Sequence, residues 1–217
     1  SKTFTQVFMI IAPKDSSVSV LHSQAVTVQG AANMDVELYV NDSFIEKRKI
    51  RVDGIVDFLN IEVPSGNVQF EARLLNNDGT LSASLQRAMH ILGTPSQISI
   101  HLESERIQAN KNESIKGTVQ VLDEWNYALQ NGIITIGADS GFISSEDIDQ
   151  YSRGVQLQLF EGKTEFEYRP GKNAGVATIF VQSDIVQASK EIILDTPIEP
   201  LSIVGLVSGA GNIASGV

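Results

Sequence analysis

Short runs in which apolar and polar residues alternate follow one another along most of this chain. Residues 26–30 (VTVQG), 68–74 (VQFEARL) and 176–181 (VATIFV) are clear examples, and Gly, Asn, Asp and Pro separate the runs. Alternation with a period of two is typical of β-strands that bury one face. No long stretch repeats with the helical period, so we expect little helix. The pattern predicts strands over 7–11, 25–30, 36–40, 44–52, 55–63, 68–74, 82–92, 98–102, 115–122, 132–136, 155–160, 164–168, 176–181 and 192–194.

The runs form two similar series, and the segment Gly93-Thr94-Pro95 lies between them. An immunoglobulin-like sandwich needs about 100 residues, so a chain of 217 residues accommodates two. We therefore predict an all-β fold of two tandem immunoglobulin-like antiparallel β-sandwiches, placed end to end, over residues 1–93 and 96–196. The short connection is expected to limit their relative freedom.

Two segments depart from the strand pattern. Residues 139–153 form a long acidic insertion, for which we expect a loop or a short helical turn. Residues 197–217 are rich in Gly, Ala and Ser. Two interpretations of this last segment stay open: a Gly-rich tail or linker, or the first strand of a following domain, for example a membrane barrel.

Composition narrows the class of protein. The formal net charge is −10, and an acidic surface repels phosphates, so nucleic acid is not expected as a partner. Cysteine is absent, which excludes disulfides, thiolate metal sites and cysteine nucleophiles, and favours a bacterial version of the fold. No apolar run is long enough for a transmembrane helix. The first residues do not resemble a signal peptide, so we expect a mature protein or an excised fragment.

Three motifs in the first half carry a resemblance to a known family. A first strand ends in proline (Ala12-Pro13), a V-x-V-x-G strand covers 26–30, and an x-V-x-L-Y-V-N strand covers 35–41. The stretch 68–85 has the form of a closing hairpin around Asp78-Gly79. Residues 1–93 thus resemble the bacterial immunoglobulin-like modules of cell-surface proteins.

The second half resembles the invasin/intimin type of bacterial immunoglobulin-like domain. Two features depart from that pattern: the turn 124–127 (EWNY) is bulkier than the family's small D-x-x-G-N turn, and the acidic insertion is long. Gln130 also stands where a small residue is typical. The matching motifs are the opening strand 95–102, the alanine-asparagine turn in 107–110, a T-V-x-V-x-D strand end at 118–123, the run 129–136, and a G-x-A-T-V-like strand at 174–179.

The resemblance implies a structural or adhesion module, a stalk or spacer, within a larger bacterial protein that is secreted or exposed at the cell surface or outer membrane. The implied partners are neighbouring domains of the same polypeptide, a surface protein or a glycan, and the parent protein could be anchored in a membrane. No cofactor is implied. Two alternatives stay open: a carbohydrate- or protein-binding module, and an accessory region of a secreted enzyme whose catalytic domain lies outside this chain.

We expect no enzymatic activity from the chain itself. No G-x-S-x-G motif of the hydrolase type is present. The three histidines, His22, His90 and His101, are not spaced like converging zinc ligands, and we expect His101, which faces the opposite side of its strand from Ile100, at the surface or the rim.

Acidic side chains in the insertion are candidates for calcium binding. Glu146, Asp147 and Asp149 lie close together in the sequence, and Asp139 precedes them. Calcium prefers oxygen ligands from loops, but the regular D-x-D-x-D-G order is missing. A solvated acidic loop is therefore the competing interpretation.

Two further groups are candidates for ligand binding. Lys47, Lys49 and Arg51 would share one face of a strand and could meet an anionic glycan, or form the solvated face of a hairpin that resists edge-to-edge aggregation. Trp125 and Tyr127 lie in one turn. They could stack on a sugar or anchor a partner, whereas the competing interpretation places Trp125 as a plug at the end of the sandwich.

Overall fold

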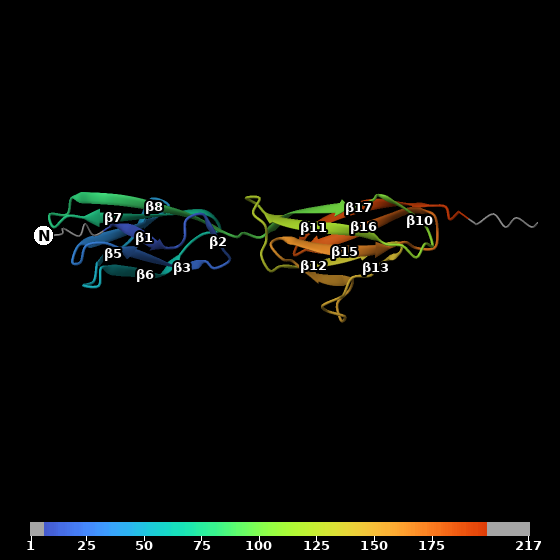
Figure 1. Ribbon diagram of the computed structural model, residues 1–217, viewed down its shortest axis with the longest axis horizontal. Helices are drawn as coiled ribbons and strands as arrows, with labels where there is room; N and C mark the ends of the chain where they lie inside the picture. Colours follow the sequence, from blue (N-terminus) through green and yellow to red (C-terminus); the bar gives the residue numbers. More distant parts are fainter. Residues whose placement is uncertain (1–6, 199–217) are drawn as a thin grey trace, which may run out of the picture.

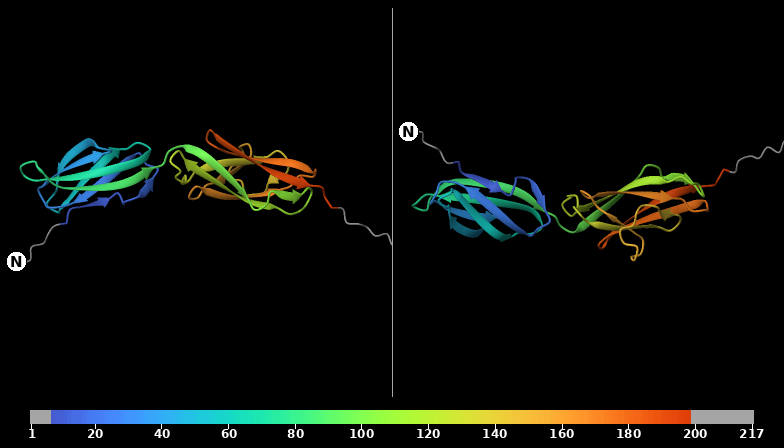
Figure 2. Two further views of the ribbon diagram at one scale, coloured as in Figure 1. Left: turned by 90° about the horizontal axis from the view of Figure 1, so that it is seen from above. Right: turned by 60° about the horizontal axis from the view of Figure 1, so that its bottom comes forward.

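The computed structural model describes residues 7–198, and every regular element in that range is a β-strand. The strands form two sandwiches, which follow one another along the long axis of the molecule and are joined by a single chain segment (Figure 1 and Figure 2). Within the described residues there is no helix of a length and hydropathy that could cross a bilayer.

The first sandwich packs a three-stranded sheet, β1-β3-β6, against a five-stranded sheet, β2-β8-β7-β4-β5. Neighbouring strands are antiparallel except for β2, which pairs in parallel with the end of β8. The bounds are β1 Met9–Ala12, β2 Ser17–Ser19, β3 Ser23–Gln29, β4 Asp35–Val40, β5 Ser43–Lys49, β6 Ile55–Glu62, β7 Gly66–Leu75 and β8 Leu81–Ile91.

The second sandwich packs a four-stranded sheet, β13-β15-β11-β9, against a five-stranded sheet, β10-β17-β16-β12-β14. Only β10 pairs in parallel, along the end of β17. The bounds are β9 Pro95–Leu102, β10 Arg106–Gln108, β11 Ile115–Asp123, β12 Ile133–Ala138, β13 Phe142–Ile143, β14 Val155–Gln158, β15 Lys163–Arg169, β16 Gly175–Ser183 and β17 Val186–Asp195. This sheet division is that of an immunoglobulin-like sandwich.

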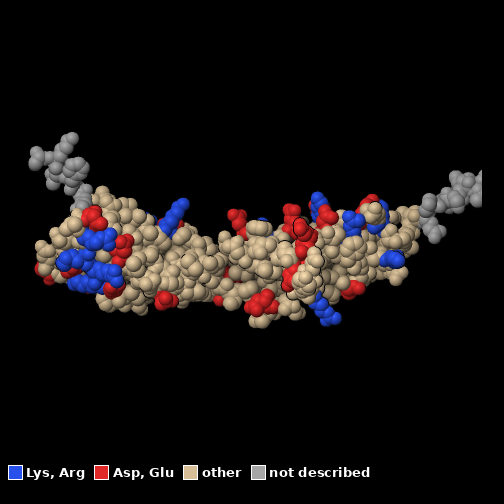
Figure 3. Space-filling model, turned by 90° about the horizontal axis from the view of Figure 1, so that it is seen from below, with Lys and Arg blue, Asp and Glu red and all other residues tan. Residues whose placement is uncertain are grey.

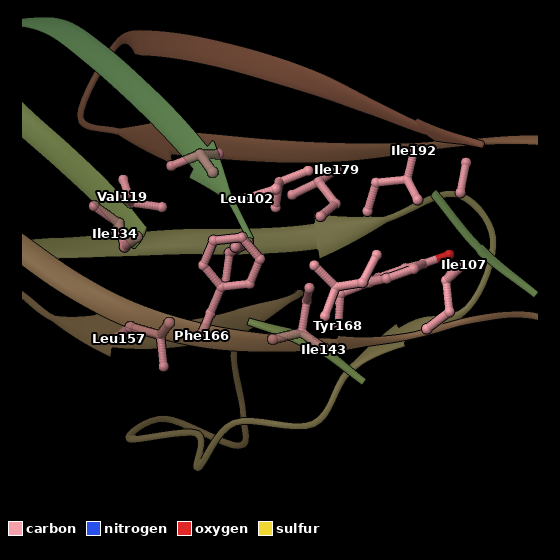
Figure 4. Close-up of a cluster of buried hydrophobic side chains, with 14 of the residues drawn as sticks. Leu102, Ile107, Val119, Ile134, Ile143, Leu157, Phe166, Tyr168, Ile179 and Ile192 are labelled. Carbon is pink, nitrogen blue, oxygen red and sulfur yellow. The ribbon is translucent and has the colours of Figure 1, made fainter. Parts of the chain in front are cut away.

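Each sandwich encloses its own core of mainly Val, Ile and Leu side chains. Phe58 and Phe70 are the large buried rings of the first core. In the second core, Phe166 and Tyr168 project from β15 towards the opposite sheet, among aliphatic side chains from both sheets (Figure 4). The hydroxyl of Tyr168 donates a hydrogen bond to the carbonyl of Ser140 at 2.9 Å, so its polar end is satisfied inside the core.

The predicted fold class is confirmed, with three short strands that the pattern did not indicate. These are β2, β10 and β13, and each pairs at the edge of a sheet. The insertion 139–153 contains β13 and then a loop, which projects away from the body of the second sandwich (Figure 1). The predictions for the Gly-rich segment concern residues that lie, from 199 onwards, outside the described range.

Candidate functional site

The most distinctive site in the structure lies where the two sandwiches meet. Strand β8 of the first sandwich leads into β9 of the second through only three residues, 92–94. His90 lies near the end of β8, and the turn 123–127 of the second sandwich folds over it. We call the contact formed by Asn67, His90, Gly93, Asp123, Trp125 and Tyr127 the junction.

Asp123 is the polar centre of the junction, and its side chain is fully buried. Its Oδ2 accepts hydrogen bonds from His90 Nε2 at 2.9 Å and from the backbone N–H of Gly93 at 3.1 Å. Its Oδ1 accepts from the backbone N–H groups of Trp125 at 2.9 Å and Tyr127 at 2.8 Å. One carboxylate thus closes its own turn and binds both the linker and the neighbouring sandwich.

The imidazole ring of His90 has neighbours at both of its nitrogens and on its face. Its Nδ1 lies 2.9 Å from the side-chain oxygen of Asn67, its partner across β7 and β8. Both ring nitrogens of His90 are thus within hydrogen-bond distance of a side-chain oxygen, that of Asn67 on one side and that of Asp123 on the other. The ring of Tyr127 stacks on it at 3.5 Å between centroids, and Trp125 meets it edge-on at 5.7 Å.

Two glycines make room for the indole of Trp125. A Cβ atom built on Gly66 or on Gly93 would come within 2.7 Å of the Trp125 ring. Gly66 also has a φ of +97°, a backbone conformation that other residues rarely adopt. Trp125 therefore lies against bare backbone of both the first sandwich and the linker.

The junction also sets the charge state of Asp123. Burial alone would raise the pKa of this carboxyl. The hydrogen bonds from His90 and from the backbone N–H groups of Tyr127, Gly93 and Trp125 outweigh burial and hold the pKa below its ordinary value of 3.8. Asp123 is thus a charged group, fully paired, at neutral pH.

Trp125 and Tyr127, predicted as ligand-binding residues, are brought together here and lie against His90. Each side chain is nevertheless 38% exposed. Their inner faces are used by the contact between the sandwiches, which is closest to the interpretation of Trp125 as a plug. Ligand binding through their outer edges stays a prediction.

The predicted calcium residues occupy separate positions. Asp139 accepts a hydrogen bond from the backbone N–H of Thr178. Asp147 caps Asp149 and Gln156 through their backbone N–H groups, and Asp149 binds the hydroxyl of Ser152. Over residues 7–198, no group of three or more His, Asp or Glu side chains has the arrangement of a metal site. Calcium binding by these residues with Glu146 stays a prediction.

In the predicted anion-binding cluster, Lys47, Lys49 and Arg51 each form an ion pair with a carboxylate of the first sandwich. Lys49 lies 2.9 Å and Lys47 3.9 Å from the carboxylate of Asp35, and Arg51 binds Asp57 at 2.9 Å. Figure 3 shows Lys and Arg side chains gathered at one end of the first sandwich, with acidic side chains beside them. The cations therefore neutralise local carboxylates, and binding of an anionic glycan here stays a prediction.

Sequence reasoning missed the centre of the junction. It assigned no role to His90, whose side chain is only 2% exposed. His90 lies on the outer face of its sheet and is covered by the second sandwich rather than by its own. One feature of the sequence could have pointed to the junction: Asp123 ends a predicted strand and is followed by the unusually bulky residues Trp125 and Tyr127.

Comparisons with known proteins add structural likenesses only. No protein-family model and no curated protein matches the chain. Among solved structures, invasin, a bacterial integrin-binding protein, matches with a TM-score of 0.44 and 14% identity over 89% of this chain and 40% of its own. The D00-D0 domain of intimin matches with a TM-score of 0.40 and 12% identity over 87% of this chain and 100% of its own.

A β-glycosidase from Bacteroides vulgatus also matches, with a TM-score of 0.42 and 14% identity over 88% of this chain. The chain spans only 25% of the length of that enzyme. These identities and TM-scores are too low to assign a family or a function to the chain.

Proposed function

We propose that this chain is a non-enzymatic rigid spacer, a pair of sandwiches that holds other domains of a larger bacterial surface or secreted protein at a fixed distance and orientation. The observation that carries the proposal is the buried pair His90–Asp123, which joins the two sandwiches at 2.9 Å with both side chains almost fully removed from solvent.

A spacer needs resistance to bending, and the junction supplies it. If the sandwiches rotated apart, the Asp123 carboxylate would lose its hydrogen bonds from His90 and from the linker at Gly93. A buried carboxylate is costly to leave without its hydrogen-bond donors. Two rings of the second sandwich add contact area at the junction. Tyr127 stacks on His90, and Trp125 packs against Gly66 and Gly93.

The location and the larger parent protein rest on the sequence resemblance of both halves to bacterial surface modules. A carbohydrate- or protein-binding module is the second candidate, because the rings of Trp125 and Tyr127 keep an exposed edge beside the junction. An accessory region of a secreted enzyme would use the same rigidity to position a catalytic domain.

Nuclear spin relaxation of backbone amides tests the spacer directly. One rigid body predicts a single rotational diffusion tensor that fits the amides of both sandwiches. The variant His90→Ala should need two tensors, whereas His101→Ala, an exposed histidine of the second sandwich, should behave like the parent protein. Two independent tensors in the parent protein would refute the spacer role.

A further inference from the structure

A groove on the outer face of the second sandwich has no part in the junction. It has a volume of about 830 Å³ and lies over strands β12, β16 and β17, bounded by the turn at Arg153 and Gly154. Ile134, Ile136, Ile179 and Val181 of these strands point into the core, so the side chains of residues between them face outwards.

The floor of the groove carries a row of polar side chains. Thr135 on β12, Gln182 on β16 and Gln187 on β17 lie side by side in register, and Gln156 of β14, which is buried and does not line the groove, is the neighbour of Thr135 on the other side. The bonds within this row are long: 3.4 Å from Gln156 Nε2 to Thr135 Oγ1, and 3.5 Å from Gln187 Nε2 to Gln182 Oε1. Two amide nitrogens also donate shorter bonds to backbone carbonyls, Gln182 to Asp184 at 2.9 Å and Gln156 to Arg153 at 3.0 Å. Hydrogen bonds of about 3.5 Å are weak, so the amide of Gln187, the side-chain oxygen of Gln182 and the hydroxyl of Thr135 keep hydrogen-bonding capacity for a ligand.

An aromatic ring stands beside this row. Phe180 is 49% exposed on the outer face, and its partner in register on β12 is Gly137. A Cβ atom on Gly137 would meet nothing within 4 Å, and the residue does not have a positive φ. Neither backbone conformation nor packing requires glycine here, although glycine weakens a strand interior. What glycine does provide is open space next to the Phe180 ring.

The groove also differs in charge from its surroundings. Residues 96–196 contain 8 basic and 15 acidic residues, yet no carboxylate lines the groove. Its charged residue is Arg153, which forms no ion pair with any carboxylate between residues 7 and 198. An arginine without an acidic partner, at the edge of a cavity, presents its planar donors to a carboxylate from outside.

We propose that this groove binds an acidic glycan, a chain of sugar rings that carry carboxylates. The Phe180 ring would pack against the apolar face of one sugar ring above Gly137. Gln182, Gln187 and Thr135 would bind its hydroxyls, and Arg153 would pair with the carboxylate. The three polar side chains lie on three neighbouring strands about 4.8 Å apart, so the row is about 10 Å long and suits a short oligosaccharide. This site is independent of the spacer role.

The test begins with an array of glycans that contain galacturonic, glucuronic, mannuronic or guluronic acid, each beside its methyl-esterified or neutral counterpart. The tightest acidic glycan is then titrated calorimetrically. We expect binding that falls at least about tenfold in Phe180→Ala, since aromatic anchors dominate such contacts. Phe160→Ala removes a ring of 71% exposure outside the groove and should bind as the parent does.

Two further variants separate binding from folding. Gly137→Thr fills the open space with a residue that favours strands, so the melting temperature should stay equal or rise while binding is lost. Arg153→Gln should abolish the preference for the acid over its ester, whereas Lys172→Gln, an exposed lysine elsewhere, should not. No enrichment of acidic glycans on the array, or binding unchanged in Gly137→Thr, would overturn the proposal. Equal affinity for acid and ester would overturn the assignment of an acidic ligand.

Discussion

His90 Nε2 and Asp123 Oδ2 lie 2.9 Å apart, although one residue belongs to the last strand of the first sandwich and the other to the second. Each sandwich has its own core, so neither needs the other to bury its aliphatic side chains. The pair instead fixes how the sandwiches are oriented. The predictions that follow concern this contact first.

Removing the carboxylate should be strongly destabilising. Asp123→Ala leaves Nε2 of His90 and three backbone N–H groups without their acceptor. We expect the free energy of unfolding of the second sandwich to fall by about 3 kcal/mol, the low end for breaking a buried pair. Urea titration followed by fluorescence measures it, because Trp125 is the only tryptophan. Glu191→Ala, an exposed carboxylate, should change stability by less than about 0.5 kcal/mol.

The junction should weaken in acid rather than in base through Asp123. Hydrogen bonds hold the pKa of this carboxyl below 3.8, so the folded state takes up the proton less readily than the unfolded chain. The stabilisation is therefore complete above the unfolded value and is lost as the pH falls through the lower folded pKa. The stability difference between the parent protein and Asp123→Asn should shrink between about pH 5 and about pH 2. A difference that grows towards low pH would contradict this assignment.

Filling the space under the indole should disturb the junction without touching its polar groups. The Cβ atom of Gly93→Ala would lie 2.7 Å from the Trp125 ring and would also clash with the carboxylate of Glu124, so both side chains must move. We expect a cost of about 1–3 kcal/mol, typical of overpacking, and a red shift of the Trp125 emission as the ring meets water. Gly137→Ala is the matched control, because its Cβ would meet open space on a backbone without positive φ.

The basic cluster of the first sandwich should become an anion site only when its acidic partner is removed. The hydrogen bond from Lys49 holds the pKa of Asp35 below its ordinary value, and Lys47 lies on the same carboxylate. Asp35→Asn leaves both lysines without this partner, so the variant should elute from immobilised heparin at higher salt than the parent. Asp42→Asn, an exposed residue outside the cluster, should elute like the parent. Equal retention of Asp35→Asn and the parent would show that Asp35 does not mask the cluster.

The sequence was sufficient for the strands that bury one face, because period-two alternation reports burial directly. The sequence was insufficient for strands that pair with a neighbour over only a few residues. Strands β2 and β10 cover three residues each and join their sheets in parallel, and no alternation can be read over such a length.

The turn at Asp53-Gly54 shows a second limit. Its composition favours a hairpin, yet β5 and β6 on either side belong to opposite sheets. Gly54 adopts a φ of +81° and its N–H binds the carbonyl of Arg51, so a turn is present. Local chemistry specified the turn, and packing of the apolar faces decided that the chain crosses between sheets.

The junction could be predicted only in part for a related reason. Trp125 and Tyr127 stood out because bulky rings are unusual in such a turn, whereas His90 looked like an ordinary outward-facing residue. Its burial depends on a neighbouring sandwich, and a strand pattern describes a residue's own sheet. The groove beside Phe180 could not be predicted from the sequence, because Gln182 and Gln187 are polar residues at outward-facing strand positions, where polar residues are usual.

The central claim is that the two sandwiches form one rigid body, and a distance measurement between them tests it most directly. The chain contains no cysteine, so Ser82→Cys on β8 and Glu191→Cys on β17, both exposed, give one spin label on each sandwich. Double electron–electron resonance should then show a single narrow distance distribution, which broadens when Asp123→Ala is added. A broad distribution in the protein with Asp123 intact would contradict the rigid junction.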